Sequence, residues 1–169
     1  LLRHYLGEEI YDAGIQKYLR DNRGGLVESA DLRRALEEVS GEHLGWLFDQ
    51  WVYGRGVPTI SSKHSWADGS LSVVVSQTQE EGTFSVPLTV EIGHEDGTSS
   101  RSMWLEGPSS TLTVALDTPP KWVAVDPVGA AIAKWKRKQS TEEWIAQLEG
   151  SAHYRAKIHA MLALGKVKA

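Results

Sequence analysis

The chain has 169 residues, of which 41% are hydrophobic and 24% charged, and it contains no cysteine. This composition is that of ordinary folded proteins and argues against disorder, and no stretch is apolar enough to span a bilayer. The formal net charge of -4 gives no electrostatic basis for binding nucleic acid. The lack of cysteine excludes disulfides, thiolate zinc sites and cysteine nucleophiles, and it leaves the compartment open, with the cytoplasm favoured.

Residues 1–55 carry apolar side chains at helical spacing, which predicts three short helices. Ser29 is a suitable N-cap for the second helix. Gly41 is a suitable stop for the same helix, because glycine adopts the left-handed conformation at low cost. The three apolar stripes are Tyr11, Ile15, Tyr18 and Leu19, then Leu32, Leu36 and Val39, then Leu44, Leu47, Phe48 and Trp51.

Residues 56–127 change to a period of two, which predicts half-buried strands. The alternating positions are Phe84, Val86, Leu88, Val90 and Ile92, and then Leu112, Val114 and Leu116. Turn-forming pairs at Asp68-Gly69, Asp96-Gly97 and Gly107-Pro108 separate the runs and predict antiparallel hairpins. This segment therefore predicts a small Ig-like β-sandwich.

Residues 128–169 return to a helical pattern. The basic run Lys134–Lys138 is interpreted as a solvated helix face rather than a binding patch. Ser140-Thr141-Glu142-Glu143 has the form of a capping box, and a last helix is expected from Ala152 to Leu164. The predicted fold class is α+β, with a central antiparallel β-sandwich and helical segments at both ends.

Histidine and carboxylate pairs are the residues of this sequence that could hold a metal ion. The zincin string His-Glu-x-x-His is absent, because Thr98 stands where His94-Glu95 would need a second histidine. His4 and Glu8 have i, i+4 spacing, which favours a hydrogen bond on a helix surface over a metal site. The remaining histidines have no partner in the sequence pattern, and they are His43, His64, His153 and His159.

No nucleophile motif of the form Gly-x-Ser-x-Gly occurs. The consecutive carboxylates point to different sides of their helices and are interpreted as solvated. They are Glu8-Glu9, Glu37-Glu38 and Glu142-Glu143. The prediction is therefore that this chain holds no catalytic, no cofactor-binding and no metal-binding residue.

Seven tryptophans leave two interpretations open. Exposed rings on a sandwich could form a platform for a sugar, peptide or protein partner. The favoured interpretation is that five of them fill gaps between segments, while Trp66 and Trp104 lie within the strand region. The five are Trp46, Trp51, Trp122, Trp135 and Trp144.

Three stretches resemble the aminopeptidase N family of gluzincin zinc metallopeptidases. Residues 1–9, which read LLRHYLGEE, resemble a helix that follows the family's zinc site. Residues 31–41, which read DLRRALEEVSG, are followed by Trp51 and Gly56-Val57-Pro58 and resemble the end of its catalytic domain. Residues 155–165, which read RAKIHAMLALG, resemble a HEAT-like helix at the start of its C-terminal domain.

The resemblance implies a parent protein that removes N-terminal residues from peptides with a zinc-bound water and a glutamate general base. It implies domains at 1–55, 56–127 and 128–169, and zinc ligands outside this chain. The expected partners are the rest of the parent chain and its peptide substrate, with no nucleic acid and no membrane span. The exposed apolar stripes are candidates for pairing isolated copies as a homodimer. A stand-alone binding module and an inactive scaffold homologue remain the alternatives.

Overall fold

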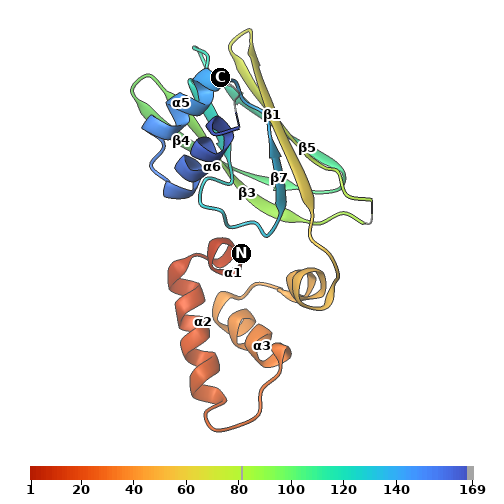
Figure 1. Ribbon diagram of the computed structural model, residues 1–169. Coiled ribbons are helices and arrows are strands. Elements are labelled where there is room, and N and C mark those ends of the chain that lie inside the picture. Colours follow the sequence, from red (N-terminus) through yellow and green to blue (C-terminus); the bar gives the residue numbers. More distant parts are fainter. Residues whose placement is uncertain (81, 167–169) are drawn as a thin grey trace. The chain divides into compact units, whose positions relative to one another are not determined.

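Helices build the first part of the chain and strands most of the second, as the computed structural model shows for residues 1–80 and 82–166 (Figure 1). The chain divides into two compact units, Leu1–Gly56 and Val57–Ala169. The α+β fold class predicted from the sequence is confirmed. Among the described residues, no helix combines the length and the apolarity needed to cross a membrane.

The first unit is helical, and glycines with positive φ mark two of its helix boundaries. Gly7 has a φ of 83° and separates the first two helices, and Gly41 ends the third with a φ of 70°, as expected. The elements are α1 (Leu2–Leu6), α2 (Glu8–Asp21), α3 (Ser29–Ser40), α4 (Gly45–Phe48) and the π-helical turn η1 (Asp49–Tyr53).

One local prediction for this unit was wrong, and another was confirmed in a modified form. The N-cap of α3 is Glu28 rather than Ser29, because the Glu28 and Asp31 side chains form a reciprocal capping box. The third predicted helix forms as α4 and continues directly into η1, and Trp51 packs against the same cluster as the rest of its stripe. Its apolar residues still join one buried cluster, which consists of Leu6, Leu36, Leu44, Leu47 and Phe48.

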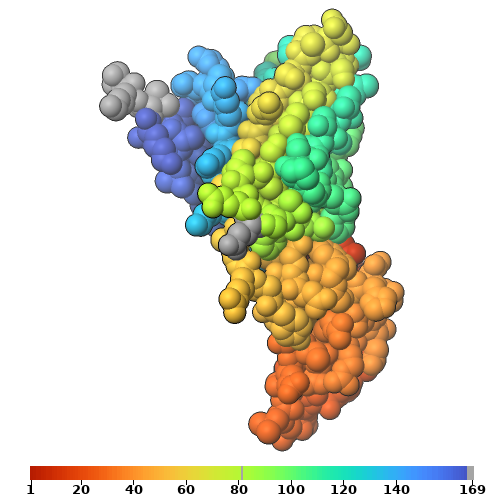
Figure 2. Space-filling view, turned by 90° about the vertical axis from the view of Figure 1, so that its right-hand side faces the viewer, coloured from red at the N-terminus to blue at the C-terminus, as the bar shows by residue number. Residues whose placement is uncertain are grey.

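The second unit contains two β-sheets. The first has the order β5-β2-β1-β7 and the second the order β4-β3-β6. In the space-filling view, the tip of the yellow β1–β2 hairpin lies beside the green-blue strand β5 (Figure 2). The strands are β1 (Thr59–Ala67), β2 (Ser70–Gln77), β3 (Val86–His94), β4 (Gly97–Leu105), β5 (Ser109–Ala115), β6 (Trp122–Val125) and β7 (Lys134–Arg137).

The period-two positions form the core of this unit, as predicted. Val86, Val90 and Ile92 are fully buried along β3. The hairpin between β1 and β2 turns at Asp68 and Gly69, whose φ values of 50° and 74° suit a tight two-residue connection. The alternation therefore specified which face of each strand is buried.

The basic run at 134–138 is not a helix face, and that prediction was wrong. Residues Lys134–Arg137 form β7, which pairs in parallel with β1 and matches Ile60 with Trp135. Trp135 and Arg137 are half-buried, whereas Lys134, Lys136 and Lys138 are exposed. Exposed and half-buried side chains alternate with the period of two that is typical of a strand. The strand is only a few residues long, and it forms because it pairs with β1.

The C-terminal helices α5 (Thr141–Gly150) and α6 (Tyr154–Leu164) lie within the second unit (Figure 1). Helix α5 begins with the predicted capping box, because Ser140 Oγ accepts from Glu143 N and Glu143 Oε2 accepts from Ser140 N. Trp122, Ala124 and Ala156 form a second buried cluster. The predicted division into three domains stays a prediction.

Candidate functional site

His4 and Glu8 do not lie on one helix, because Gly7 separates α1 from α2. Glu8 Oε1 instead accepts a hydrogen bond of 2.7 Å from Arg3. Glu8 therefore takes part in an exposed ion pair with Arg3, which contributes little to stability.

His94 lies at the end of β3, and its neighbours form the turn into β4. Its Nε2 lies 2.7 Å from the hydroxyl of Ser99 across that hairpin. His94 pairs with Gly97 in this hairpin, so the segment is not helical.

The sequence pattern missed one contact completely. His64, in β1, places Nε2 at 2.6 Å from Oε1 of Glu143, in the first turn of α5. Both side chains are largely buried, with exposed fractions of 11% and 24%. Because the two residues are 79 positions apart, no local spacing could have indicated this pair.

The consecutive carboxylates are not all solvated, so that prediction was wrong for two of them. Glu37 Oε1 accepts a hydrogen bond of 2.8 Å from the backbone of Leu44. Glu143 accepts a hydrogen bond from Ser140 N in the capping box, and its other carboxyl oxygen contacts His64. Among the described residues, no three His, Asp or Glu side chains gather closely enough to hold a metal ion, and we assign no zinc ligand to them.

The tryptophans are mostly buried or half-buried against neighbouring segments. Trp122 and Trp144 are buried, and Trp46 and Trp51 are partly buried against the helical cluster. Trp66 is half-buried and donates from its indole to the carbonyl of Leu116. Only Trp104 is exposed among the described tryptophans, at 39%. A flat aromatic platform is therefore not formed.

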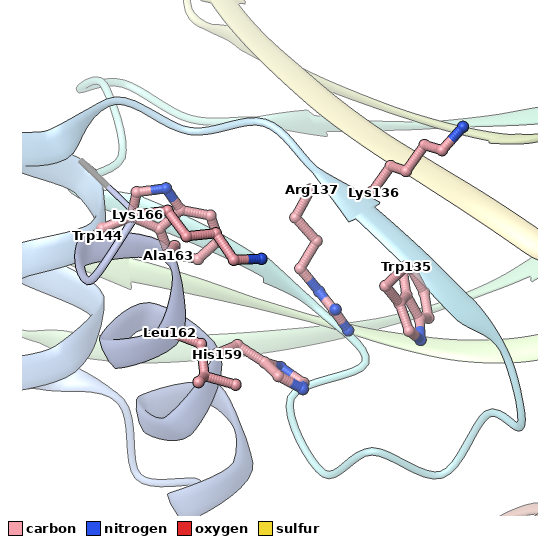
Figure 3. A pocket seen from close by; sticks show the side chains of 8 residues that line it. All are labelled: Trp135, Lys136, Arg137, Trp144, His159, Leu162, Ala163 and Lys166. Atoms are coloured by element: carbon pink, nitrogen blue, oxygen red, sulfur yellow. The ribbon is translucent and has the colours of Figure 1, made fainter. Parts of the chain in front are cut away.

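A pocket with a volume of about 430 Å³ lies between β7 and α6 (Figure 3). Its walls combine cations from β7 and from residues near the end of α6 with apolar side chains of both C-terminal helices. The lining residues are Trp135, Lys136, Arg137, Trp144, His159, Leu162, Ala163 and Lys166.

Burial and positive charge govern the titratable groups of this pocket. Burial lowers the pKa of Arg137 to about 10, although Asp126 opposes the shift. Burial, and then the charges of Arg137 and Arg155, lower the pKa of His159 to about 4. The imidazole is therefore uncharged at neutral pH. Because the basic run at 134–138 was predicted to be a solvated helix face, the sequence did not indicate this pocket.

Two sheets of short strands, preceded and followed by helices, define an α+β fold. The chain is similar over 96% of its length to the crystal structure of Legionella pneumophila aminopeptidase A in complex with aspartic acid. The TM-score is 0.81 at 15% identity, and the match covers 19% of that chain. This likeness concerns the fold.

Sequence comparisons agree with the fold, although no family model matches. The chain is 27% identical over 172 residues to aminopeptidase M1 of Arabidopsis thaliana, which covers 98% of this chain and 18% of that protein. It is 33% identical over 93 residues to Tricorn protease-interacting factor F2 of Thermoplasma acidophilum, covering 53% of this chain and 12% of that protein.

The resemblance to the aminopeptidase N family is thereby confirmed, and the chain is related to the M1 aminopeptidases. It spans less than a fifth of the length of the relatives it matches.

Proposed function

We propose that this chain is a non-catalytic interdomain part of a zinc-dependent aminopeptidase that removes N-terminal residues from peptides. The observation that supports this proposal most directly is the match over 98% of the chain to 18% of aminopeptidase M1. In such a parent, zinc would polarise the scissile carbonyl and activate water. The His-Glu-x-x-His ligands are not part of this sequence, so no step is assigned to its residues.

The proposed role is to hold neighbouring domains in position. The chain would supply the helical end of a catalytic domain at 1–55, a sandwich domain at 56–127 and the start of a HEAT-like helical domain at 128–169. Several apolar side chains on α5 and α6 are exposed, which suits packing against further parts of the parent chain. These are Ile145, Tyr154, Ile158, Met161 and Leu162.

A stand-alone binding module receives less support, because Trp104 is the single exposed tryptophan of the described residues. An inactive scaffold homologue would contain the same segment, and it differs from an active parent only in residues outside this chain.

The test has two arms. In the first, the isolated chain is incubated with excess zinc and a fluorogenic amino-acid amide, and turnover and bound zinc are measured in one sample. We expect neither turnover nor stoichiometric zinc. In the second, this chain replaces the matching segment of Arabidopsis aminopeptidase M1, and the chimera is expected to bind zinc and hydrolyse the amide.

Turnover by the isolated chain with one bound zinc per chain would refute the non-catalytic role. A chimera that stays unfolded while the isolated chain unfolds cooperatively and reversibly would favour an independent module over an interdomain part.

A further inference from the structure

The pocket between β7 and α6 shares Leu162 with the exposed apolar side chains assigned above to packing against the parent chain, and its two walls differ in chemistry. Trp144, Leu162 and Ala163 form an apolar wall, and Arg137 and Lys166 supply cations. Its volume of about 430 Å³ lies within the range of small-molecule sites.

The side chains of Arg137, His159 and Lys166 extend toward the same space (Figure 3). The ammonium group of Lys166 points toward Arg137, whereas Lys136 turns away from the opening (Figure 3). The guanidinium of Arg137 lies 4.1 Å from the centre of the Trp135 ring, and its Nη2 lies 3.5 Å from the carbonyl oxygen of Val125. These two contacts hold the guanidinium in place and leave other N–H donors free to meet a ligand.

No acid in the described part of the chain forms an ion pair with these cations. None of its ion pairs includes Lys136, Arg137 or Lys166. Asp126 is near enough to influence Arg137, but it is buried and its two oxygens accept from the backbone N–H groups of Ala130 and Ala131. Two cations therefore face one opening, and the buried charge of Asp126 opposes that of Arg137 without forming an ion pair.

We propose that this pocket binds a small organic carboxylate with an aromatic or aliphatic body. The carboxylate would lie between Arg137 and Lys166, and the body would rest against Trp144 and Leu162. The planar donors of arginine match the two oxygens of a carboxylate. The apolar wall distinguishes this ligand from inorganic phosphate, which has no apolar part to bury there.

The proposal is tested with the full 169-residue chain, labelled with nitrogen-15, by following its indole N–H resonances during titration. Three probes are compared, namely N-acetyl-L-phenylalanine, its neutral amide and inorganic phosphate. Titrations are repeated with Arg137→Gln and Lys166→Gln. Lys134→Gln is the matched control, because Lys134 is an exposed cation on the same strand that does not line the pocket.

We expect saturable binding of the carboxylate, with weaker or no binding of the amide and phosphate. Each pocket variant should weaken carboxylate binding about tenfold, as the loss of a charged hydrogen bond does, and Lys134→Gln should leave it unchanged. Lys166→Gln keeps the test valid if Arg137→Gln impairs folding. Equal binding of acid and amide, tighter binding of phosphate, equal weakening by Lys134→Gln, or no binding at all would each overturn the proposal.

Discussion

The hydroxyl of Ser151 donates a hydrogen bond of 2.7 Å to Oε2 of Glu91, and both residues are almost fully buried. Glu91 lies in the middle of β3, and Ser151 follows the end of α5. The backbone N–H of Ala152 points at the other carboxyl oxygen at 3.4 Å. This carboxyl group therefore ties the connection between α5 and α6 to the second sheet.

Ser151→Ala should lower the free energy of unfolding by about 1–3 kcal/mol, because it leaves a buried carboxyl oxygen without its donor. Chemical denaturation of the chain measures the change. Ser100→Ala is the matched control, since Ser100 is exposed in β4, and it should change stability by less than about 0.5 kcal/mol. Equal effects of the two variants would show that the buried hydrogen bond contributes nothing specific.

Gly14→Ala should destabilise the helical unit, although alanine favours helix over glycine by about 1 kcal/mol. A Cβ at position 14 would lie 2.6 Å from Leu36 Cδ2 and 3.3 Å from Leu36 Cα. Leu36 is completely buried, so it has little room to move, and overpacking of this kind costs about 1–3 kcal/mol. The steric cost exceeds the propensity gain, and thermal unfolding should show a lower midpoint.

Ala13→Gly is the control that measures helix propensity alone. Ala13 is exposed on the same helix, so the reverse change should cost about 1 kcal/mol through propensity alone. If Gly14→Ala instead raised stability, α2 and α3 would not be held in close contact at this point.

Much of the fold could be predicted because periodicity is a local property of the sequence. The alternation from Val86 to Ile92 specified the buried face of β3, and Gly41 specified the end of α3. The prediction for residues 134–138 failed because this segment is short and its structure depends on pairing with β1, which lies more than seventy residues earlier. A propensity for helix or strand in so few residues is overridden by the neighbouring strand.

The candidate site could not be predicted for the same physical reason. The contacts around Arg137 and His159 join a strand to a helix whose positions are set by the packed unit. The pair of His64 and Glu143 likewise joins residues that share no local pattern. Sequence spacing detects sites built within one element, and here both contacts are built between elements.

Glu143→Ala should lower the free energy of unfolding by about 1–2 kcal/mol, because it removes the capping contact with Ser140 N and the contact with His64 together. Glu143→Gln should cost less, since its amide oxygen can still accept from the cap. Glu149→Ala, on the exposed surface of α5, should change stability by less than about 0.5 kcal/mol.

A double-mutant cycle with His64→Ala separates the two roles of Glu143. The two changes should be non-additive by about 1 kcal/mol, because the residues are in direct contact. Strict additivity in denaturation experiments would mean that Glu143 stabilises the helix end only and that His64 does not depend on it.

His159 should make stability depend on pH in a defined window. Its pKa is lowered from 6.5 to about 4 by burial and by the charges of Arg137 and Arg155. Between these two values the unfolded chain binds a proton that the folded chain does not, so stability falls as the pH decreases from 6.5 toward 4. Above this window His159 contributes no pH dependence. His159→Gln should flatten the pH profile of chemical denaturation within the window alone.

Arg137→Gln should raise the pKa of His159 part of the way toward 6.5, because it removes one cation and leaves the ring half-buried. Titration of the imidazole carbon-bound protons by nuclear magnetic resonance gives this pKa directly. Arg155→Gln should act in the same direction with a smaller effect, since Arg155 is the lesser of the two charge contributions, and Lys134→Gln should have none. If neither arginine variant moved the pKa, burial alone would account for it, and the pocket would not carry the positive potential that these cations are expected to create.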